Sequence, residues 1–141
     1  MGISLLFYAF PQNRVIEEID KIRWISGVNR FPKNIAYMIP AISGSLEKLF
    51  FRGVLLNALL KEGLSFSLSL AIVTVLFVYG QITLTNTKIQ VLVMAISSII
   101  ISIVGGLLFV ATGSIVPPII IHVSSAGFFA QPFKERTVKY Q

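Results

Sequence analysis

The sequence contains no cysteine, which excludes disulfide bonds and thiolate-bound metal sites. It also contains little charge, because only 13% of its residues are Asp, Glu, Lys or Arg, and 6 acidic residues stand against 12 basic ones. Two stretches, 63–87 and 89–133, hold none of these four residue types, and His122 is the only titratable group in the second. Such long uncharged stretches exclude an ordinary soluble domain.

Apolar residues take the place of the missing charge: 55% of the chain is hydrophobic and the mean hydropathy is +0.81. A transmembrane helix needs about 20 apolar residues, so the first uncharged stretch can hold one span and the second can hold two. The sequence therefore predicts an all-α, polytopic helix bundle that is integral to a membrane. About four transmembrane helices are expected, near residues 34–60, 64–83, 89–111 and 115–133.

The chain is expected to consist of three parts: an N-terminal membrane-surface segment (1–33), a transmembrane core (34–133) and a basic C-terminal tail (134–141). The first ten residues, MGISLLFYAF, are apolar, lack a basic leader and precede Pro11. We expect them to form a short membrane-surface or half-inserted segment rather than a cleaved signal peptide.

Residues 12–28 are predicted to form one amphipathic helix that lies in the membrane interface, because apolar and charged side chains fall on different helical faces. The apolar face carries Val15, Ile19, Ile22 and Ser26, and the charged face carries Arg14, Glu17, Glu18 and Lys21.

The basic residues are distributed unevenly across the predicted membrane. Nine lie on the side that holds both termini: Arg14, Lys21, Arg23, Arg30, Lys33, Lys88, Lys134, Arg136 and Lys139. Only Lys61 falls in a loop on the opposite side. The positive-inside rule then predicts that both termini are cytoplasmic. We interpret the net charge of +6 as a topology signal with some attraction to anionic lipid, not as a nucleic-acid site.

Three ionisable residues, Glu47, Lys48 and Arg52, lie inside the first predicted span. A charge at the bilayer centre costs at least about 2.5 kcal/mol, so these side chains require an interior cavity, a partner or both. Lys48 and Arg52 are four residues apart and share a helical face. Their neutralising partner is expected to be Glu47, a carbonyl group, a lipid phosphate or another chain.

Three motifs give the sequence a recognisable pattern. EKLFFRG at 47–53 resembles the first motif of the CAAX prenyl protease and bacteriocin-processing family of intramembrane endopeptidases, which has two adjacent glutamates, three residues and an arginine, often followed by glycine. TGSIVPPIIIH at 112–122 resembles its last motif, in which a turn and prolines lead to a histidine. FVYGQ at 77–81 occupies the place of a Phe-x-x-x-His motif. The resemblance covers about residues 34–133, which it identifies as a CAAX-protease-like core.

The resemblance implies a mechanism in which glutamate and histidine activate a water molecule, while an asparagine and a second histidine help to hold the oxyanion. It implies that Glu47 and His122 are the candidate catalytic residues and that Arg52 and Gln81 support them. No cofactor is implied. A zinc site is not expected either, because it needs three good protein ligands and only Glu47 and His122 are available.

Three positions depart from the family pattern. Lys48 replaces the second glutamate, so an attraction to Arg52 becomes a repulsion. Gln81 replaces the middle histidine and cannot carry a proton in the neutral range. Ala126 replaces an Asn or Asp and offers no polar group. The hydrolytic machinery therefore looks degraded.

The depths of two candidate residues in the membrane also differ. Gln81 is about 17 residues into the second span and His122 about 7 into the fourth, which separates them by roughly 15 Å at 1.5 Å per residue. We expect them not to meet unless the fourth segment begins as a re-entrant segment.

Structural interpretations stand beside these functional ones. Glu47 is a catalytic base or a counter-ion for the two buried cations. His122 and Gln81 are site residues or make hydrogen bonds between helices. A stripe of small residues in the third span, Ser98, Ser102 and Gly106, is attributed to close helix packing alone.

Three functions therefore remain open. The first is a non-catalytic or weakly active family member that acts as an accessory or immunity-type subunit and binds a peptide or membrane partner. The second is an active endopeptidase that uses Glu47 and His122. The third is a structural subunit of a membrane complex, in which another chain binds Lys48 and Arg52. In each case the expected partners are the lipid bilayer and a membrane protein or membrane-associated peptide, not nucleic acid.

Overall fold

The computed structural model describes residues 12–129, and every regular element within them is a helix. The helices are α2 (Gln12–Asp20), α3 (Arg23–Val28), α4 (Lys33–Lys48), η1 (Leu49–Leu56), α5 (Asn57–Lys61), α6 (Phe66–Ile82), α7 (Lys88–Thr112) and α8 (Val116–Phe129). The predicted all-α class is confirmed for this part of the chain. The predicted surface segment at 1–10 and the basic tail at 134–141 lie outside the described residues.

The first long helical run consists of α4, η1 and α5, which follow one another from residue 33 to 61. Its middle part, η1, is π-helical, a geometry with i→i+5 hydrogen bonds that is frequent at functional sites. Lys48 is the last residue of α4, and Arg52 lies in η1. The intramembrane charges therefore lie where the helix geometry changes.

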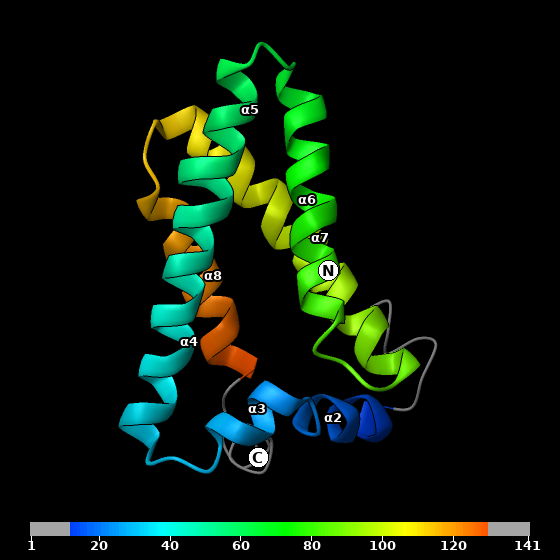
Figure 1. The fold of residues 1–141 in the computed structure, drawn as a ribbon. Coiled ribbons are helices and arrows are strands. Elements are labelled where there is room, and N and C mark those ends of the chain that lie inside the picture. Colours follow the sequence, from blue (N-terminus) through cyan, green and yellow to red (C-terminus); the bar gives the residue numbers. More distant parts are fainter. Residues whose placement is uncertain (1–11, 130–141) are drawn as a thin grey trace.

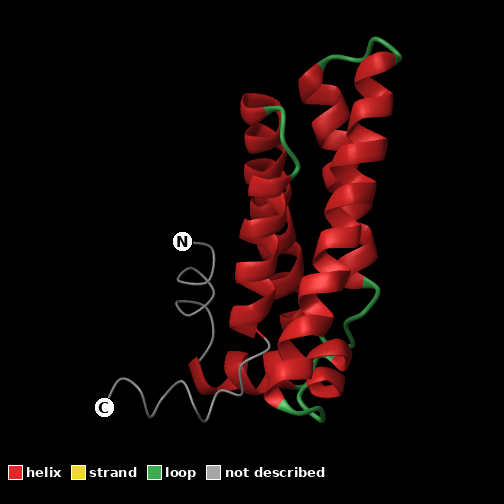
Figure 2. Ribbon diagram, turned by 90° about the vertical axis from the view of Figure 1, so that its left-hand side faces the viewer, coloured by secondary structure: helices red, strands yellow, loops and turns green. Residues whose placement is uncertain are grey.

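The long helices form an upright bundle (Figures 1 and 2). Helix α7 packs against α6 and α8, and α8 also packs against α4. The ends of these helices are not level: α8 begins well below the turn that joins α5 to α6 in Figure 1. Helices α2 and α3 lie across the lower end of the bundle in the same view.

The predicted single helix over residues 12–28 is wrong, because the chain breaks between α2 and α3 at Lys21 and Ile22. In one straight helix Ile25 would lie at the edge of the face formed by Val15, Ile19 and Ile22, and Val28 would point away from it. The break turns them inward instead, and both are buried. Ser26, which was expected on the apolar face, is only half-buried and donates a hydrogen bond to the carbonyl oxygen of Arg23.

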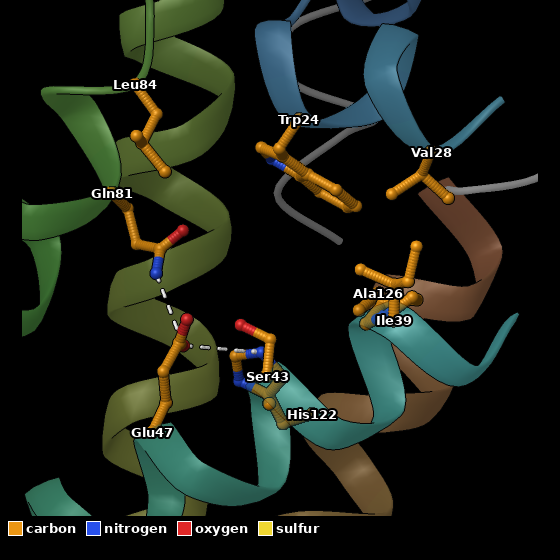
Figure 3. A pocket seen from close by; sticks show the side chains of 11 residues that line it. Trp24, Val28, Ile39, Ser43, Glu47, Gln81, Leu84, His122 and Ala126 are labelled. Atoms are coloured by element: carbon orange, nitrogen blue, oxygen red, sulfur yellow. Dashed lines mark hydrogen bonds and ion pairs between the residues drawn. The ribbon is translucent and has the colours of Figure 1, made fainter. Parts of the chain in front are cut away.

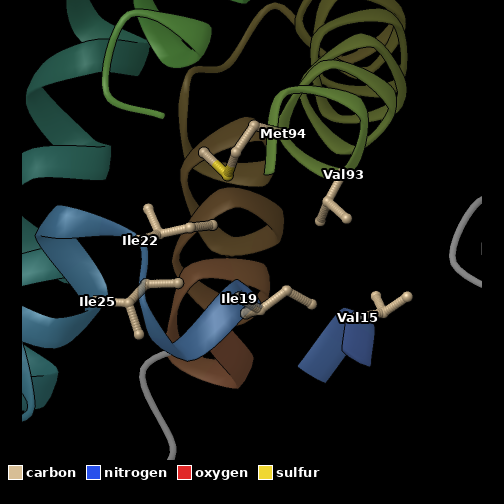
Figure 4. Close-up of a cluster of buried hydrophobic side chains, with 6 residues drawn as sticks. All are labelled: Val15, Ile19, Ile22, Ile25, Val93 and Met94. Atoms are coloured by element: carbon tan, nitrogen blue, oxygen red, sulfur yellow. The ribbon is translucent and has the colours of Figure 1, made fainter. Parts of the chain in front are cut away.

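A small hydrophobic core attaches this surface segment to the bundle. Val15, Ile19, Ile22 and Ile25 cluster with Val93 and Met94 of α7 (Figure 4). Two hydrogen bonds to Glu18 add to the attachment: the Thr87 hydroxyl donates to its carboxylate at 2.6 Å and the Gln90 amide to its carbonyl oxygen at 2.9 Å. Helices α2 and α3 are therefore fixed to the first turns of α7.

One of the described helices, α7, is long and apolar enough to cross a membrane by length and composition. Helices α6 and α8 are apolar but shorter, with 17 and 14 residues. Large apolar side chains point outward from several helices, as lipid-facing side chains do; examples are Val54, Val75 and Ile120. The helical segments lie close to the predicted ones, while four transmembrane spans remain a prediction.

Candidate functional site

One cavity brings together residues from four helices that are far apart in the sequence. It has a volume of about 140 Å³, and the residues around it include Trp24 of α3, Ser43 and Glu47 of α4, Gln81 of α6, and His122 and Ala126 of α8. Glu47 is the only Asp, Glu, Lys or Arg among the described residues that line it. In Figure 3, Glu47, Gln81 and His122 point toward one another.

A single carboxylate oxygen of Glu47 contacts both polar neighbours. The Gln81 amide donates a hydrogen bond to Glu47 Oε2 at 3.3 Å, and His122 Nε2 lies 3.6 Å from the same oxygen. The candidate catalytic residues Glu47 and His122 and the supporting residue Gln81 are therefore adjacent. Arg52, the other supporting candidate, is not among the residues that line this cavity.

The expected separation of Gln81 and His122 is wrong, since both contact Glu47. The depth count assumed that all helices end at the same level. Because α8 begins well below the turn between α5 and α6 (Figure 1), His122 reaches the depth of the last turn of α6. The sequence analysis had named one exception, a re-entrant fourth segment, in which Gln81 and His122 could come together.

Gly44 permits the close approach of α4 and α8 at this point. A Cβ atom added to Gly44 would lie 2.5 Å from His122 Cδ2 and 3.1 Å from His122 Nε2, closer than carbon and nitrogen atoms pack in proteins. The absence of a side chain at residue 44 therefore leaves the space that the imidazole ring occupies beside Glu47.

Lys48 is fully buried and does not contact Glu47 through an ion pair. Its side chain is 0% exposed, its ammonium lies 3.8 Å from the centroid of the Phe77 ring, and its Nζ atom has no hydrogen-bond partner. This cation–π contact and the charge of the neighbouring Glu47 carboxylate both offset the loss of water around the ammonium. Lys48 therefore occupies the position of the family's second glutamate without supplying any of its chemistry.

Arg52 is also 0% exposed, and it binds α7. Its Nη2 atom donates to the Ser102 carbonyl oxygen at 2.8 Å and to the Ser102 hydroxyl at 3.0 Å. The Ser102 hydroxyl also shares a 2.8 Å hydrogen bond with the Thr74 hydroxyl. The Nε and Nη1 atoms of Arg52 have no hydrogen-bond partner. A carbonyl group was one of the predicted partners of the buried charges, and here it is that of Ser102.

These contacts bear on the two structural interpretations of the charges. No ion pair joins Glu47 to Lys48 or Arg52 within residues 12–129, so the carboxylate acts as an acceptor for Gln81 and His122 rather than as their direct counter-ion. Lys48 and Arg52 contact groups of their own chain. Their role in binding another chain stays a prediction.

Sequence reasoning missed two kinds of site residue. Trp24 lines the cavity, and the signal for it was a lone tryptophan in a surface segment, which the prediction of a plain interfacial helix overlooked. Ser102 belongs to the small-residue stripe, whose members are buried as close packing requires. The stripe was attributed to packing alone, but the Ser102 hydroxyl also binds Arg52.

The chemistry available at the cavity is that of one carboxylate with three polar neighbours, Ser43, Gln81 and His122. Within the described part of the chain, no three His, Cys, Asp or Glu side chains form a group that could hold a metal ion. Glu47 can accept hydrogen bonds or a proton, whereas Gln81 cannot take up a proton and Ala126 offers no donor.

Replacing Lys48 by methionine is expected to raise the free energy of unfolding by about 0.5 to 1.5 kcal/mol. A buried charge in a membrane helix costs about 2.5 to 3.5 kcal/mol, and the contact with Phe77 returns about 2 kcal/mol. Methionine keeps the length of the side chain. Unfolding by SDS in mixed micelles, followed through the single tryptophan, measures the change.

Lys61→Met is the matched control, because Lys61 is exposed at the end of α5, and its replacement should change stability by less than about 0.5 kcal/mol. A Lys48→Met protein less stable than the wild type would show that the buried ammonium holds the bundle together.

Comparisons with known proteins agree with this geometry. A family model described as type II CAAX prenyl endopeptidase, Rce1-like, matches residues 32–128, which is more than half of the chain. The match covers α4 to α7 and nearly all of α8, and thus all the residues that contact Glu47. Searches of curated proteins and of solved structures found no match.

Proposed function

The chain belongs to the Rce1-like family of type II CAAX prenyl endopeptidases, and from this premise we propose that it binds a membrane-embedded peptide segment at Glu47 without cleaving it efficiently. The resemblance seen in the sequence is thereby confirmed at the level of the family, and the chain is a CAAX-protease-like membrane protein. Its role as an accessory or immunity-type subunit, with a membrane protein or peptide as partner, is part of the proposal.

The observation that carries the proposal is one carboxylate surrounded by polar groups: Gln81 Nε2 lies 3.3 Å and His122 Nε2 3.6 Å from Glu47 Oε2, and the Ser43 hydroxyl also hydrogen-bonds to the carboxylate. A carboxylate has about four acceptor positions, so Glu47 retains acceptor capacity toward the cavity. Backbone N–H groups of a peptide have no water to bind inside a bilayer. An extended or unwound peptide segment gains a charge-assisted hydrogen bond by donating to Glu47, and a cavity of about 140 Å³ admits a backbone amide group.

Efficient hydrolysis requires groups that the cavity lacks. A general base must pass its proton on, and developing negative charge on the carbonyl oxygen needs pre-aimed donors. Ala126 supplies no donor, and Gln81 cannot relay a proton. Lys48, in place of the second carboxylate, is turned onto the Phe77 ring. These three substitutions favour binding over turnover.

Glutamate-dependent cleavage is the second candidate, and the contact of Glu47 with His122 favours it. A carboxylate and an imidazole side by side can activate a water molecule. The third candidate is a structural subunit that another chain binds through Lys48 and Arg52. The structure does not favour it, because both side chains are 0% exposed and so cannot contact a second chain.

The proposal is tested with the full chain in lipid nanodiscs and a panel of apolar peptides of about 20 residues that carry a fluorescence quencher. Trp24 lines the cavity and is the single tryptophan of the chain, so its quenching reports binding, while mass spectrometry reports cleavage. We expect wild-type protein to bind one or more peptides and to leave them intact for hours.

Two variants separate the candidates. Glu47→Ala should weaken binding about 10- to 100-fold, because a hydrogen bond to a charged acceptor contributes about 1.5 to 3 kcal/mol. Glu47→Gln keeps an acceptor oxygen and should weaken binding only a few-fold. Cleavage by the wild type that vanishes in Glu47→Gln would establish the endopeptidase instead, and binding that is unchanged in Glu47→Ala would remove Glu47 from the site.

A further inference from the structure

A second, smaller cavity lies on the other side of His122. It has a volume of about 40 Å³ and shares Trp24, Gln81, His122 and Ala126 with the first cavity. Its remaining wall includes three hydroxyl groups that the first cavity lacks: those of Ser97 and Ser98 on α7 and of Ser125 on α8. The proposed function makes no use of this cavity.

His122 has one nitrogen on each side of this arrangement. Nε2 faces Glu47 Oε2, whereas Nδ1 is buried and has no hydrogen-bond partner among the described residues. A buried polar atom without a partner costs about 1 to 3 kcal/mol, and buried nitrogens are nearly always bonded to protein or to ordered water. Since the described residues offer Nδ1 no partner, an ordered water molecule is the group that satisfies it most simply.

The three serines have hydrogen-bonding capacity to spare. No hydrogen bond from the hydroxyl of Ser97, Ser98 or Ser125 reaches another group between residues 12 and 129. Ser125 is three residues after His122 in α8, so both lie on the same helical face. Ser97 and Ser98 approach from α7, which packs against α8.

We infer that this cavity binds one ordered water molecule, which joins His122 Nδ1 to the serine hydroxyls. A water needs about 10 to 15 Å³ of such space and two to four polar partners, and the cavity meets both conditions. The water donates one hydrogen bond to Nδ1, makes a second hydrogen bond with the hydroxyl of Ser98 or Ser125, and keeps its remaining hydrogen-bonding capacity for Ser97 or Gln81.

This water fixes the tautomer of His122. With Nδ1 as an acceptor, the neutral ring carries its proton on Nε2, which points it toward Glu47 Oε2 3.6 Å away. Ser98 and Ser125 are thus positioning residues for the imidazole, acting through the water without touching Glu47. The inference rests on the geometry around His122 and does not depend on what the first cavity binds.

The single histidine of the chain makes the test direct. Protein labelled with ¹⁵N-histidine in nanodiscs gives one pair of ring nitrogen signals. We expect Nε2 to appear as the protonated nitrogen and Nδ1 as the unprotonated acceptor, with magnetisation transfer from water protons to Nδ1. A proton on Nδ1, or the absence of transfer from water, would overturn the inference. This result needs no variant, only the wild-type protein.

Variants then assign the partners. Replacing Ser98 and Ser125 together by alanine should reduce the water transfer at least several-fold and add a second pair of ring signals with the proton on Nδ1. The single variant Ser125→Thr retains a hydroxyl group at this position, so it should give the wild-type spectrum. Ser67→Ala, on the exposed side of α6, is the control and should leave both signals unchanged.

An unchanged spectrum in the double alanine variant, with Trp24 fluorescence showing a folded protein, would also contradict the proposed roles of the serines. The spectra are recorded without any peptide, so a failure here leaves the peptide titration of Glu47 variants as an independent test of the proposed function.

Discussion

A triple variant, Lys48→Glu with Gln81→His and Ala126→Asn, is expected to cleave membrane peptides at least about 100-fold faster than the wild type. The changes return the three departures from the family pattern to the residue types that the pattern contains. A restored general acid–base pair contributes about 10²- to 10⁴-fold, and a restored oxyanion donor about 10²- to 10³-fold. A 100-fold gain therefore requires only part of the combined effect.

The structure offers a place for each new group. A carboxylate at residue 48 stands four residues before Arg52, whose Nε and Nη1 atoms have no hydrogen-bond partner, so the new ion pair finds two unused donors. At residue 81 the present amide lies 3.3 Å from Glu47 Oε2, within reach of an imidazole nitrogen. Residue 126 already lines the cavity beside His122.

Cleavage is measured by mass spectrometry on the peptides that the wild type binds, in the same nanodiscs. The control is the same triple variant with Glu47→Gln, which removes the carboxylate that hydrolysis requires and should abolish the gained activity. Peptides bound with wild-type affinity yet left intact by a folded triple variant would show that the cavity has lost more than these three side chains.

The helices of this protein could be predicted from the sequence because uncharged apolar runs of this length have few alternatives in a membrane. The boundaries near Leu64, Lys88 and Thr112 follow from loops and charges that interrupt those runs. The break at Lys21 and Ile22 could not be predicted, because the apolar pattern continues across it to Ile25. Only the burial of Val28, which packs with Ala36 of α4, does not fit one straight helix.

The site was predicted unevenly for a related reason. Resemblance to a family identified Glu47 and His122, but a count of residues along level helices placed His122 at the wrong depth. Helix tilt and the level at which α8 begins depend on packing between helices, and this packing cannot be inferred from the sequence of one helix alone. Likewise, the bond between Arg52 and Ser102 joins residues 50 positions apart, and neither position alone indicates the other.

Gly44→Ala is expected to weaken peptide binding about 10- to 100-fold, because it displaces His122 from Glu47. The new methyl group would lie 2.5 Å from His122 Cδ2, so either the imidazole rotates away or α8 moves outward. Both movements disturb the 3.6 Å contact of His122 Nε2 with Glu47 Oε2, and with it the carboxylate orientation on which the peptide's charge-assisted hydrogen bond of about 1.5 to 3 kcal/mol depends. Overpacking costs about 1 to 3 kcal/mol of stability, offset by about 1 kcal/mol from the better helix propensity of alanine.

Gly53→Ala separates the steric effect from the general effect of losing a glycine. Gly53 lies in the same helical run, and nothing is within 4 Å of a Cβ atom added there. It should gain up to about 1 kcal/mol from helix propensity and bind peptide as the wild type does. We therefore expect the two alanine variants to differ by about 1 to 3 kcal/mol in SDS unfolding, with the ¹⁵N signals of His122 altered only in Gly44→Ala.

If both alanine variants bind peptide equally well, the close approach of α4 and α8 does not position His122, and the pairing with Glu47 must be maintained from the other side of the ring. The serine-lined cavity is on that side, so the Ser98 and Ser125 variants would then carry the larger effect. If Gly44→Ala alone loses binding while its ¹⁵N spectrum still has the proton on Nε2, the water keeps the tautomer and the methyl group alters only the distance to Glu47. Peptide binding and the ¹⁵N spectrum together thus separate two roles. The serines of the second cavity set the tautomer and orientation of the imidazole, and Gly44 sets its distance from the Glu47 carboxylate.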